Sequence, residues 1–285
     1  DIDAFAAVAR YLRSSALSAP AIIASDPDNG LLLLEDFGDN SFTTLLHAEP
    51  TKEHALYGAA TDLLVHLHAG PPPENVPNYL VNDMARKSEI VFEWYIAQIS
   101  GQEKQSLTQK FRHEITRLLH PIMVAAPTLA LRDYHSDNLM WLPARNGIRR
   151  VGLLDFQDAV MTHPAYDLAS LLQDARRDVQ PAIQQAMIAR YMQSTGSNAA
   201  EFLTAYAICG LQRNIRIIGV FTRLAIAYNK PGYLDFLPRV WGHILDDLEH
   251  PVLHDLRELI LNNFPPPDPQ IIESLRSTCR QNHIR

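Results

Sequence analysis

The sequence predicts an α+β fold with two lobes, a small first lobe that contains β-structure and a large second lobe that is mainly helical. Two apolar runs near the start, AIIAS and LLLLE, flank residues 26–30, whose Asp, Pro, Asn and Gly side chains favour a hairpin turn. After residue 51 the apolar residues recur at helical spacing. One stretch interrupts this pattern, because residues 129–156 contain two apolar runs joined by a turn and are predicted to form a second hairpin.

Composition narrows the class of function. The chain has 285 residues, 47% of them hydrophobic, so it can bury a substantial core in one large or two unequal domains. A net charge of −7 without a Lys/Arg-rich run argues against a nucleic acid or an anionic membrane as partner and favours a small molecule. Cys209 and Cys279 are too few for a disulfide framework, and no apolar run approaches the roughly 20 residues that span a bilayer. We therefore expect a cytoplasmic protein; its oligomeric state is not predicted.

The elements are expected in a simple order. A helix spans about residues 2–12, the first hairpin follows, and the glycine-containing segment FGDNSF connects the two lobes. We expect residues 1–35 to be the remnant of a small lobe, 36–40 a hinge, and 41–285 a helical lobe that carries a catalytic hairpin at 129–158. Further helices are predicted at residues 51–69, 81–99, 107–124, 166–176, 181–193, 200–228, 237–248 and 254–261. The residues that follow the Pro265 to Pro267 run are expected to form a solvated tail.

The residues that best suit catalysis lie in the second hairpin. LALRDYHSDNLMWL places Asp133 and Asn138 in a polar loop, and Asp155 ends the next apolar run, so the two loops should emerge side by side. A carboxylate can accept the proton of an attacking hydroxyl, and a transferred phosphoryl group needs a divalent metal to offset its charge. Magnesium prefers oxygen ligands and takes only one or two from the protein, which Asn138 and Asp155 could provide. Each residue alone could merely cap a turn, but the three at this spacing favour function.

These motifs resemble a known family. The string DYHSDN is similar to the protein-kinase-like catalytic loop, in which an Asp is followed by four residues and an Asn, and LDFQDA is similar to the metal-binding segment. The chain thus resembles the aminoglycoside phosphotransferase family of small-molecule kinases. LRDYHSDNLMWL, VGLLDFQDAVMTHPAYDLASLLQDARRDV and LQRNIRIIGVFTRL are most similar to its bacterial anomeric kinases for N-acetylmuramate and N-acetylglucosamine. The resemblance covers nearly the whole chain.

The resemblance implies a bilobal protein-kinase-like fold and a role for each motif residue. Asp133 would be the catalytic base, Asn138 and Asp155 the magnesium ligands, and Asp167 a buried brace of the catalytic loop. ATP would lie beside the hinge residues Glu35, Asp36, Phe37 and Gly38. The family commonly has His two residues before the base, where this chain has Leu131. No glycine-rich phosphate loop or strand lysine is recognisable, so either both lie upstream of Asp1 or this form binds nucleotide poorly.

Substrate contacts are predicted from two groups of residues. Arg213, Arg216 and Arg223 share one face of the 200–228 helix, with Asn214 adjacent, and could hold a carboxylate or a phosphate; the alternative is an ion-paired or solvated stripe. Three polar residues flank the base and the metal ligand and could bind sugar hydroxyls or merely brace the loops. They are His135, Gln157 and Asp158.

The expected activity is ATP-dependent phosphorylation of the anomeric hydroxyl of an N-acetylated amino sugar, with ATP and Mg²⁺ as cofactors and a role in cell-wall recycling. Two alternatives stay open. One is phosphorylation of an aminoglycoside, an amino alcohol or another hydroxyl acceptor. The other is a catalytically silent kinase-like binding module, which Leu131 and the missing lysine would fit, although Asp133, Asn138 and Asp155 argue against it.

Overall fold

The computed structural model describes residues 2–101 and 105–282, which fall into two compact units. The first unit combines residues 1–78 with 127–202, and the second combines 79–126 with 203–285. The first unit therefore joins the predicted small lobe and hinge to the predicted catalytic hairpin. The boundaries at residues 35 and 40 stay a prediction. No helix in the described part of the chain is long and apolar enough to cross a membrane.

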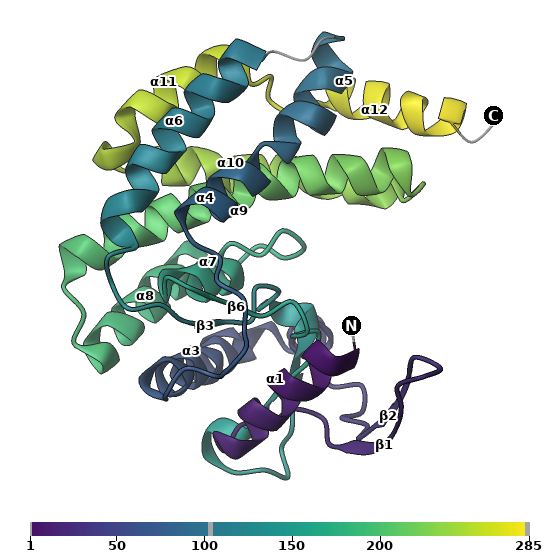
Figure 1. The fold of residues 1–285 in the computed structure, drawn as a ribbon, viewed down its shortest axis with the longest axis vertical. Helices are drawn as coiled ribbons and strands as arrows, with labels where there is room; N and C mark the ends of the chain where they lie inside the picture. Colours follow the sequence, from purple (N-terminus) through teal and green to yellow (C-terminus); the bar gives the residue numbers. More distant parts are fainter. Residues whose placement is uncertain (1, 102–104, 283–285) are drawn as a thin grey trace. The chain divides into compact units, whose positions relative to one another are not determined.

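The first unit contains helices and three short two-stranded sheets (Figure 1). Its helices are α1 (Ile2–Ser14), α2 (Phe42–Ala48), α3 (Glu53–Ala69), α7 (Ala165–Leu172) and α8 (Pro181–Thr195). Its strands are β1 (Ile22–Asp26), β2 (Leu31–Leu34), β3 (Thr128–Ala130), β4 (Leu139–Trp141), β5 (Val151–Leu153) and β6 (Val160–Thr162). The long helix α3 packs against α7, α8, β3 and β5 and so lies at the centre of this unit.

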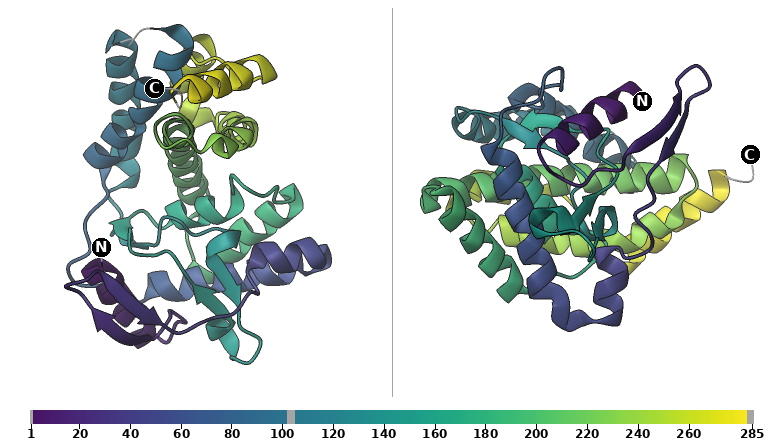
Figure 2. Two further views of the ribbon diagram at one scale, coloured as in Figure 1. Left: turned by 90° about the vertical axis from the view of Figure 1, so that its right-hand side faces the viewer. Right: turned by 90° about the horizontal axis from the view of Figure 1, so that it is seen from below.

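Local sequence explains the elements that lead to the site. The hairpin β1–β2 lies beside α1 (Figure 2), and its turn is closed by Asp26, whose carboxylate accepts the backbone N–H of Asn29 at 3.3 Å. Gly30 completes the turn with a φ of +72°, a conformation that costs glycine little. Helix α2 begins where the side chain of Ser41 accepts the N–H of Thr44 at 3.1 Å, which is a standard N-cap.

The predicted second hairpin is confirmed. Strands β4 and β5 pair antiparallel, with Leu139 opposite Leu153 and Trp141 opposite Val151. A second antiparallel pair, β3 with β6, was not predicted, because its two strands are separated in the sequence by the whole hairpin β4–β5. The two pairs place the loop before β4 and the loop after β5 at the same end of the hairpin, which positions the site.

The second unit is helical. It contains α4 (Val81–Ser88), a π-helical turn (Val91–Ile96), α5 (Ala97–Ser100), α6 (Gln105–Ile122), most of α9 (Ala199–Ala227), α10 (Leu237–Asp247), α11 (His254–Asn263) and α12 (Pro269–Asn282). Its core includes three packed rings, with centroids of Phe92 and Phe111 and of Phe92 and Phe264 both 5.3 Å apart. Gln212 on α9 donates to Tyr79, Met84 and Ser88, which ties α4 to α9.

Two sequence-based expectations are wrong. The segment after Pro267 is not a solvated tail, because α12 buries Ile272, Leu275 and Cys279 on one face. The helix predicted at 166–176 ends at Leu172, and the residues after it form a turn. That turn lies against the catalytic loop and is important below.

Candidate active site

Asp167 anchors the backbone of the predicted catalytic loop, which contains Asp133 and Asn138. Its side chain is fully buried in the first turn of α7 and accepts the backbone N–H groups of Leu131 at 2.5 Å and Arg132 at 2.9 Å. Arg132 adopts a φ of +69°, which turns two consecutive N–H groups toward one carboxylate. The predicted bracing role of Asp167 is confirmed. At position 131, where a histidine was expected from the family resemblance, the backbone N–H of Leu131 makes the contact with Asp167.

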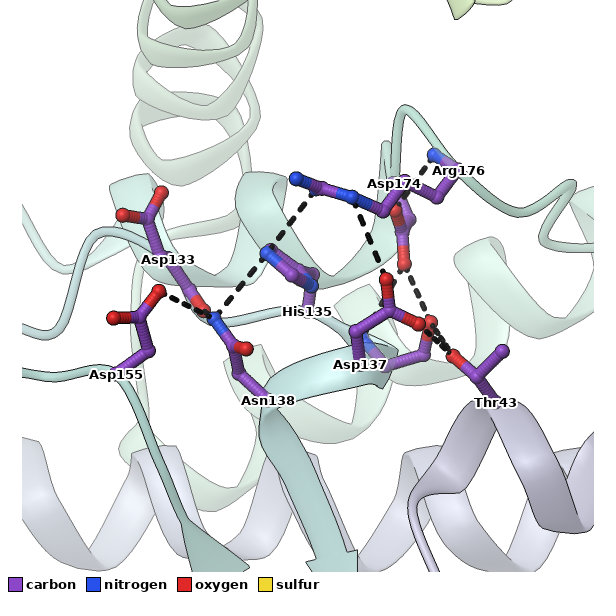
Figure 3. Close-up of polar contacts among 9 residues, drawn as sticks. Thr43, Asp133, His135, Asp137, Asn138, Asp155, Asp174 and Arg176 are labelled. Atoms are coloured by element: carbon purple, nitrogen blue, oxygen red, sulfur yellow. Dashed lines mark hydrogen bonds and ion pairs between the residues drawn. The ribbon is translucent and has the colours of Figure 1, made fainter. Parts of the chain in front are cut away.

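The structure brings the three predicted catalytic residues together (Figure 3). The amide nitrogen of Asn138 donates to the backbone oxygen of Asp133 at 2.9 Å and lies 3.4 Å from the carboxylate of Asp155. The N–H of Leu154 donates to the carbonyl of Asn138 at 3.0 Å, which links the two loops through their backbones. Asp155 has a φ of +56°, an uncommon conformation that occurs often at functional sites.

The amide of Asn138 has a defined orientation. Its nitrogen faces the Asp133 carbonyl, the Asp155 carboxylate and the Nε2 atom of His135, the last at 3.3 Å. Two of these partners are acceptors that carry no proton, so the nitrogen must occupy this side. The amide oxygen is thereby left on the other side, where it can bind a cation.

The predicted sugar contacts lie around the same loops. His135 is buried, Gln157 donates to the Asp155 carboxylate at 2.6 Å, and Asp158 is exposed and accepts from Arg132 through its backbone oxygen at 3.3 Å. These contacts are the loop bracing that was the alternative for these residues. Their part in substrate binding stays a prediction.

The predicted hinge residues contact the connection between β4 and β5. The carboxylate of Glu35 accepts the N–H of Ala21 at 3.1 Å and pairs with Arg145, on the connection between β4 and β5. The guanidinium of Arg145 also lies 4.9 Å from the ring centre of Phe37. Asp36 accepts the N–H of Gly38 at 2.7 Å, and Gly38 has a φ of +73° that closes this turn. The nucleotide-binding role of the four hinge residues stays a prediction.

The arginine-rich face lies on α9 in the second unit. Arg213 and Asn214 are buried, Arg216 is half-buried, and the amide of Asn214 donates to Asp247 at 3.3 Å. A buried, hydrogen-bonded set of this kind also stabilises helix packing, so its role in substrate binding stays a prediction.

Sequence reasoning missed a polar network beside the catalytic loop. It joins loop residues to α2 and to the turn after α7, and its members are Thr43, Ser136, Asp137, Asp174 and Arg176 (Figure 3). Ser136 and Asp137 stand inside the DYHSDN string, which was the available signal. The other three are distant in sequence, and no spacing rule connects them to it.

Solved structures share the fold of this chain. A choline/ethanolamine kinase family protein from Mesorhizobium loti superposes with a TM-score of 0.60 and 14% identity, covering 96% of this chain and 84% of that one. An aminoglycoside phosphotransferase from Streptomyces rimosus gives a TM-score of 0.51 and 15% identity, covering 73% and 82%. The fold is that of the kinase-like small-molecule phosphotransferases.

Sequence comparison defines the family. Residues 1–203 match the model of the phosphotransferase enzyme family, and the chain belongs to this family. An N-acetylmuramate/N-acetylglucosamine kinase of Caulobacter vibrioides is 39% identical over 270 residues, which cover 90% of this chain and 73% of the relative. A protein of the same description from Pseudomonas putida is 30% identical over 265 residues, covering 90% and 76%. The resemblance inferred from the motifs is confirmed.

Proposed function

We propose that this protein transfers the γ-phosphoryl group of ATP to the anomeric hydroxyl of N-acetylmuramate or N-acetylglucosamine, in the cytoplasm, as a step of cell-wall recycling. The observation that carries the proposal is the 39% identity to the Caulobacter kinase over 90% of the chain. The geometry supports it, because Asp133, Asn138 and Asp155 come together on two linked loops.

Asp133 is the proposed base. Its side chain is half-buried and stands in the loop that Asp167 braces from behind. In the proposed reaction, the anomeric oxygen forms a bond to the γ-phosphorus while the bond from that phosphorus to the β–γ bridging oxygen breaks. The hydroxyl proton passes to the Asp133 carboxylate and ADP leaves.

Asn138 and Asp155 are the proposed magnesium ligands. Magnesium takes oxygen ligands and commonly only one or two from protein, so one amide oxygen and one carboxylate fit the demand. The orientation of the Asn138 amide supports this assignment, since its nitrogen is held by Asp133 and its oxygen is on the other side. Within residues 2–101 and 105–282, no group of three or more His, Cys, Asp or Glu is placed to hold a metal ion. When bound, the ion offsets the phosphate charge.

The remaining contacts are assigned by position. We propose that Glu35, Asp36, Phe37 and Gly38 lie beside the adenine, and that His135, Gln157 and Asp158 contact the sugar. We propose that three residues of α9 bind the lactyl carboxylate of N-acetylmuramate, because a guanidinium fork suits a carboxylate. They are Arg213, Asn214 and Arg216.

An acceptor panel tests the reaction with the full-length protein, ATP and Mg²⁺. N-acetylmuramate and N-acetylglucosamine should be phosphorylated, and ³¹P NMR should show an anomeric phosphate. The methyl glycoside of N-acetylglucosamine, whose anomeric oxygen is blocked, should not react. Phosphorylation of that glycoside would refute the anomeric position. Phosphorylation of kanamycin or choline, but of neither N-acetyl sugar, would show that the acceptor belongs to another class.

The base is tested by Asp133→Ala with Asp246→Ala as control, since Asp246 is an exposed aspartate in the last turn of α10. Asp133→Ala should reduce kcat by several orders of magnitude and leave nucleotide affinity intact. Undiminished turnover would show that Asp133 is not the base.

A further inference from the structure

The turn that follows α7 contacts the catalytic loop through a buried carboxylate. Asp174 is fully buried, and its Oδ2 accepts from the Ser136 hydroxyl at 2.6 Å and from the Ser136 N–H at 3.3 Å. Its other oxygen accepts the N–H of Arg176 at 2.9 Å. Both carboxylate oxygens are thus used, one on the catalytic loop and one on the turn itself. A charge buried without such partners would be strongly unfavourable.

Arg176 extends this contact to the residues next to the metal ligand. Its Nη1 lies 3.2 Å from His135 Nε2, and its Nε lies 3.4 Å from the carboxylate of Asp137. Because arginine only donates, His135 Nε2 is an acceptor and the ring proton is on Nδ1. The same Nε2 lies 3.3 Å from the amide nitrogen of Asn138. Arg176 therefore fixes the orientation of the His135 ring, and the Asn138 amide lies against this ring.

Thr43 holds the loop from the other side. It stands in the first turn of α2, and its single hydroxyl proton is shared between the carboxylate of Asp137 and Ser136 Oγ, which lies 2.9 Å away. The Ser136 hydroxyl proton is directed at Asp174, so Thr43 is the donor in this contact. Ser136 and Asp137 are therefore held between α2 and the turn after α7. Figure 3 shows Asp137 between Thr43 and Arg176.

The turn itself is anchored to α3. Arg177 donates to Glu53 at 3.4 Å, and only 4% of Glu53 is exposed. Tyr57, one helical turn further along α3, is fully buried beside them, and burial together with the charge of Asp174 raises the pKa of its phenol. The turn after α7 is thus held to α3 on one side and contacts the loop of Ser136 on the other, so it can keep that loop in a fixed position.

We propose that Thr43, Asp174 and Arg176 are positioning residues that orient the Asn138 amide for the divalent metal. We refer to these three residues as the loop clamp. None of them is expected to touch a substrate. The proposal rests on the proposed function only in assigning Asn138 to the metal. It predicts that loss of a clamp contact weakens metal binding, as loss of outer partners of metal ligands commonly does, by about 10-fold to 100-fold.

The first test is Arg176→Gln, with Arg190→Gln as matched control. Arg190, on α8 of the same unit, pairs with Asp62 on α3 at 2.6 and 2.7 Å, away from the loop. Binding of Mn²⁺ in the presence of ADP, followed by the electron paramagnetic resonance of free Mn²⁺, reports on the site without any acceptor. Arg176→Gln should weaken Mn²⁺ binding at least about tenfold, and Arg190→Gln should leave it unchanged. In turnover assays Arg176→Gln should raise the Mg²⁺ concentration for half-maximal rate.

The second test is Thr43→Val, with Thr44→Val as control. The two threonines are neighbours on α2, but the Thr44 hydroxyl contacts the cap residue Ser41 at 2.9 Å. Thr43→Val should weaken Mn²⁺ binding, and Thr44→Val should not. Substitution of the fully buried Asp174 is expected to impair folding, so this pair of variants tests the proposal without changing that residue.

The result that would overturn the proposal is a loss of thermal stability in Arg176→Gln and Thr43→Val with unchanged Mn²⁺ binding, since these residues would then be structural only. Failure of the proposed function is distinguishable. If the wild type binds Mn²⁺ with ADP but phosphorylates no N-acetyl sugar, the acceptor assignment fails and the loop clamp is still tested.

Discussion

His163 provides a test of how burial couples pH to the stability of the site. The ring is buried just before α7, and its Nδ1 accepts the N–H of Ala165 at 3.1 Å. Burial lowers its pKa from 6.5 to about 4. Between these values the unfolded chain binds a proton that the folded chain does not, so stability falls as pH falls. For a single group with these pKa values, lowering pH from 7 to 5 costs about 2 kcal/mol of unfolding free energy.

His163→Asn removes the titration and keeps an acceptor, because the side-chain oxygen of asparagine can take the N–H of Ala165. Urea unfolding at pH 7 and pH 5 should show a smaller loss in this variant than in the wild type, by about 2 kcal/mol. His254→Asn is the control, since the His254 side chain is 72% exposed. His68, whose pKa burial lowers to about 3, stays in all three proteins and its contribution largely cancels. An equal loss in all three would refute the reasoning.

Three other substitutions probe the catalytic loop, the hinge and α9. Asp167→Asn replaces one carboxylate oxygen by an amide N–H₂, which cannot accept the N–H of Leu131 or Arg132. The free energy of unfolding in urea should fall by about 1–3 kcal/mol, and kcat should also fall. Unchanged values would show that the brace is dispensable. Gly152→Ala places a methyl 2.8 Å from the ring of Phe37, so calorimetry should find weaker nucleotide binding, and equal affinity would exclude a coupling to the hinge. Gly219→Ala places a methyl 2.5 Å from the backbone of Ile90, which cannot yield as a side chain can, so thermal unfolding should occur at a clearly lower temperature; an unchanged Tm would contradict this close packing.

Much of the site was predictable because its parts obey local rules. Two apolar runs and a turn at residues 144–147 predicted the hairpin β4–β5, which places the loops of Asn138 and Asp155 side by side. The brace at Asp167 was predicted from the motif resemblance, and both of its hydrogen bonds are present. Most predicted helices also agree with the structure to within a few residues, because periodicity reports the buried face directly.

The errors concern places where distant contacts override local preference. The periodicity of α7 continues into residues 173–176, but Asp174 uses its carboxylate on Ser136, which is 38 residues earlier in the chain. The segment of α12 is polar on average, yet three side chains on one of its faces are buried in the second unit. Strand β6 was not predicted, because its partner β3 lies on the other side of the hairpin β4–β5 in the sequence.

By itself, the sequence determined the fold class, the catalytic hairpin and the residues that carry the proposed chemistry. The hairpin and its polar loop residues follow from the spacing of apolar and polar residues within one or two adjacent elements, and the kinase-like fold class follows from the resemblance of those motifs. Only the tertiary structure decided how the loop is held, with Thr43 on one side and Asp174 and Arg176 on the other. Hydrogen bonds between segments distant in the chain depend on how those segments pack, and no periodicity within a single element encodes them.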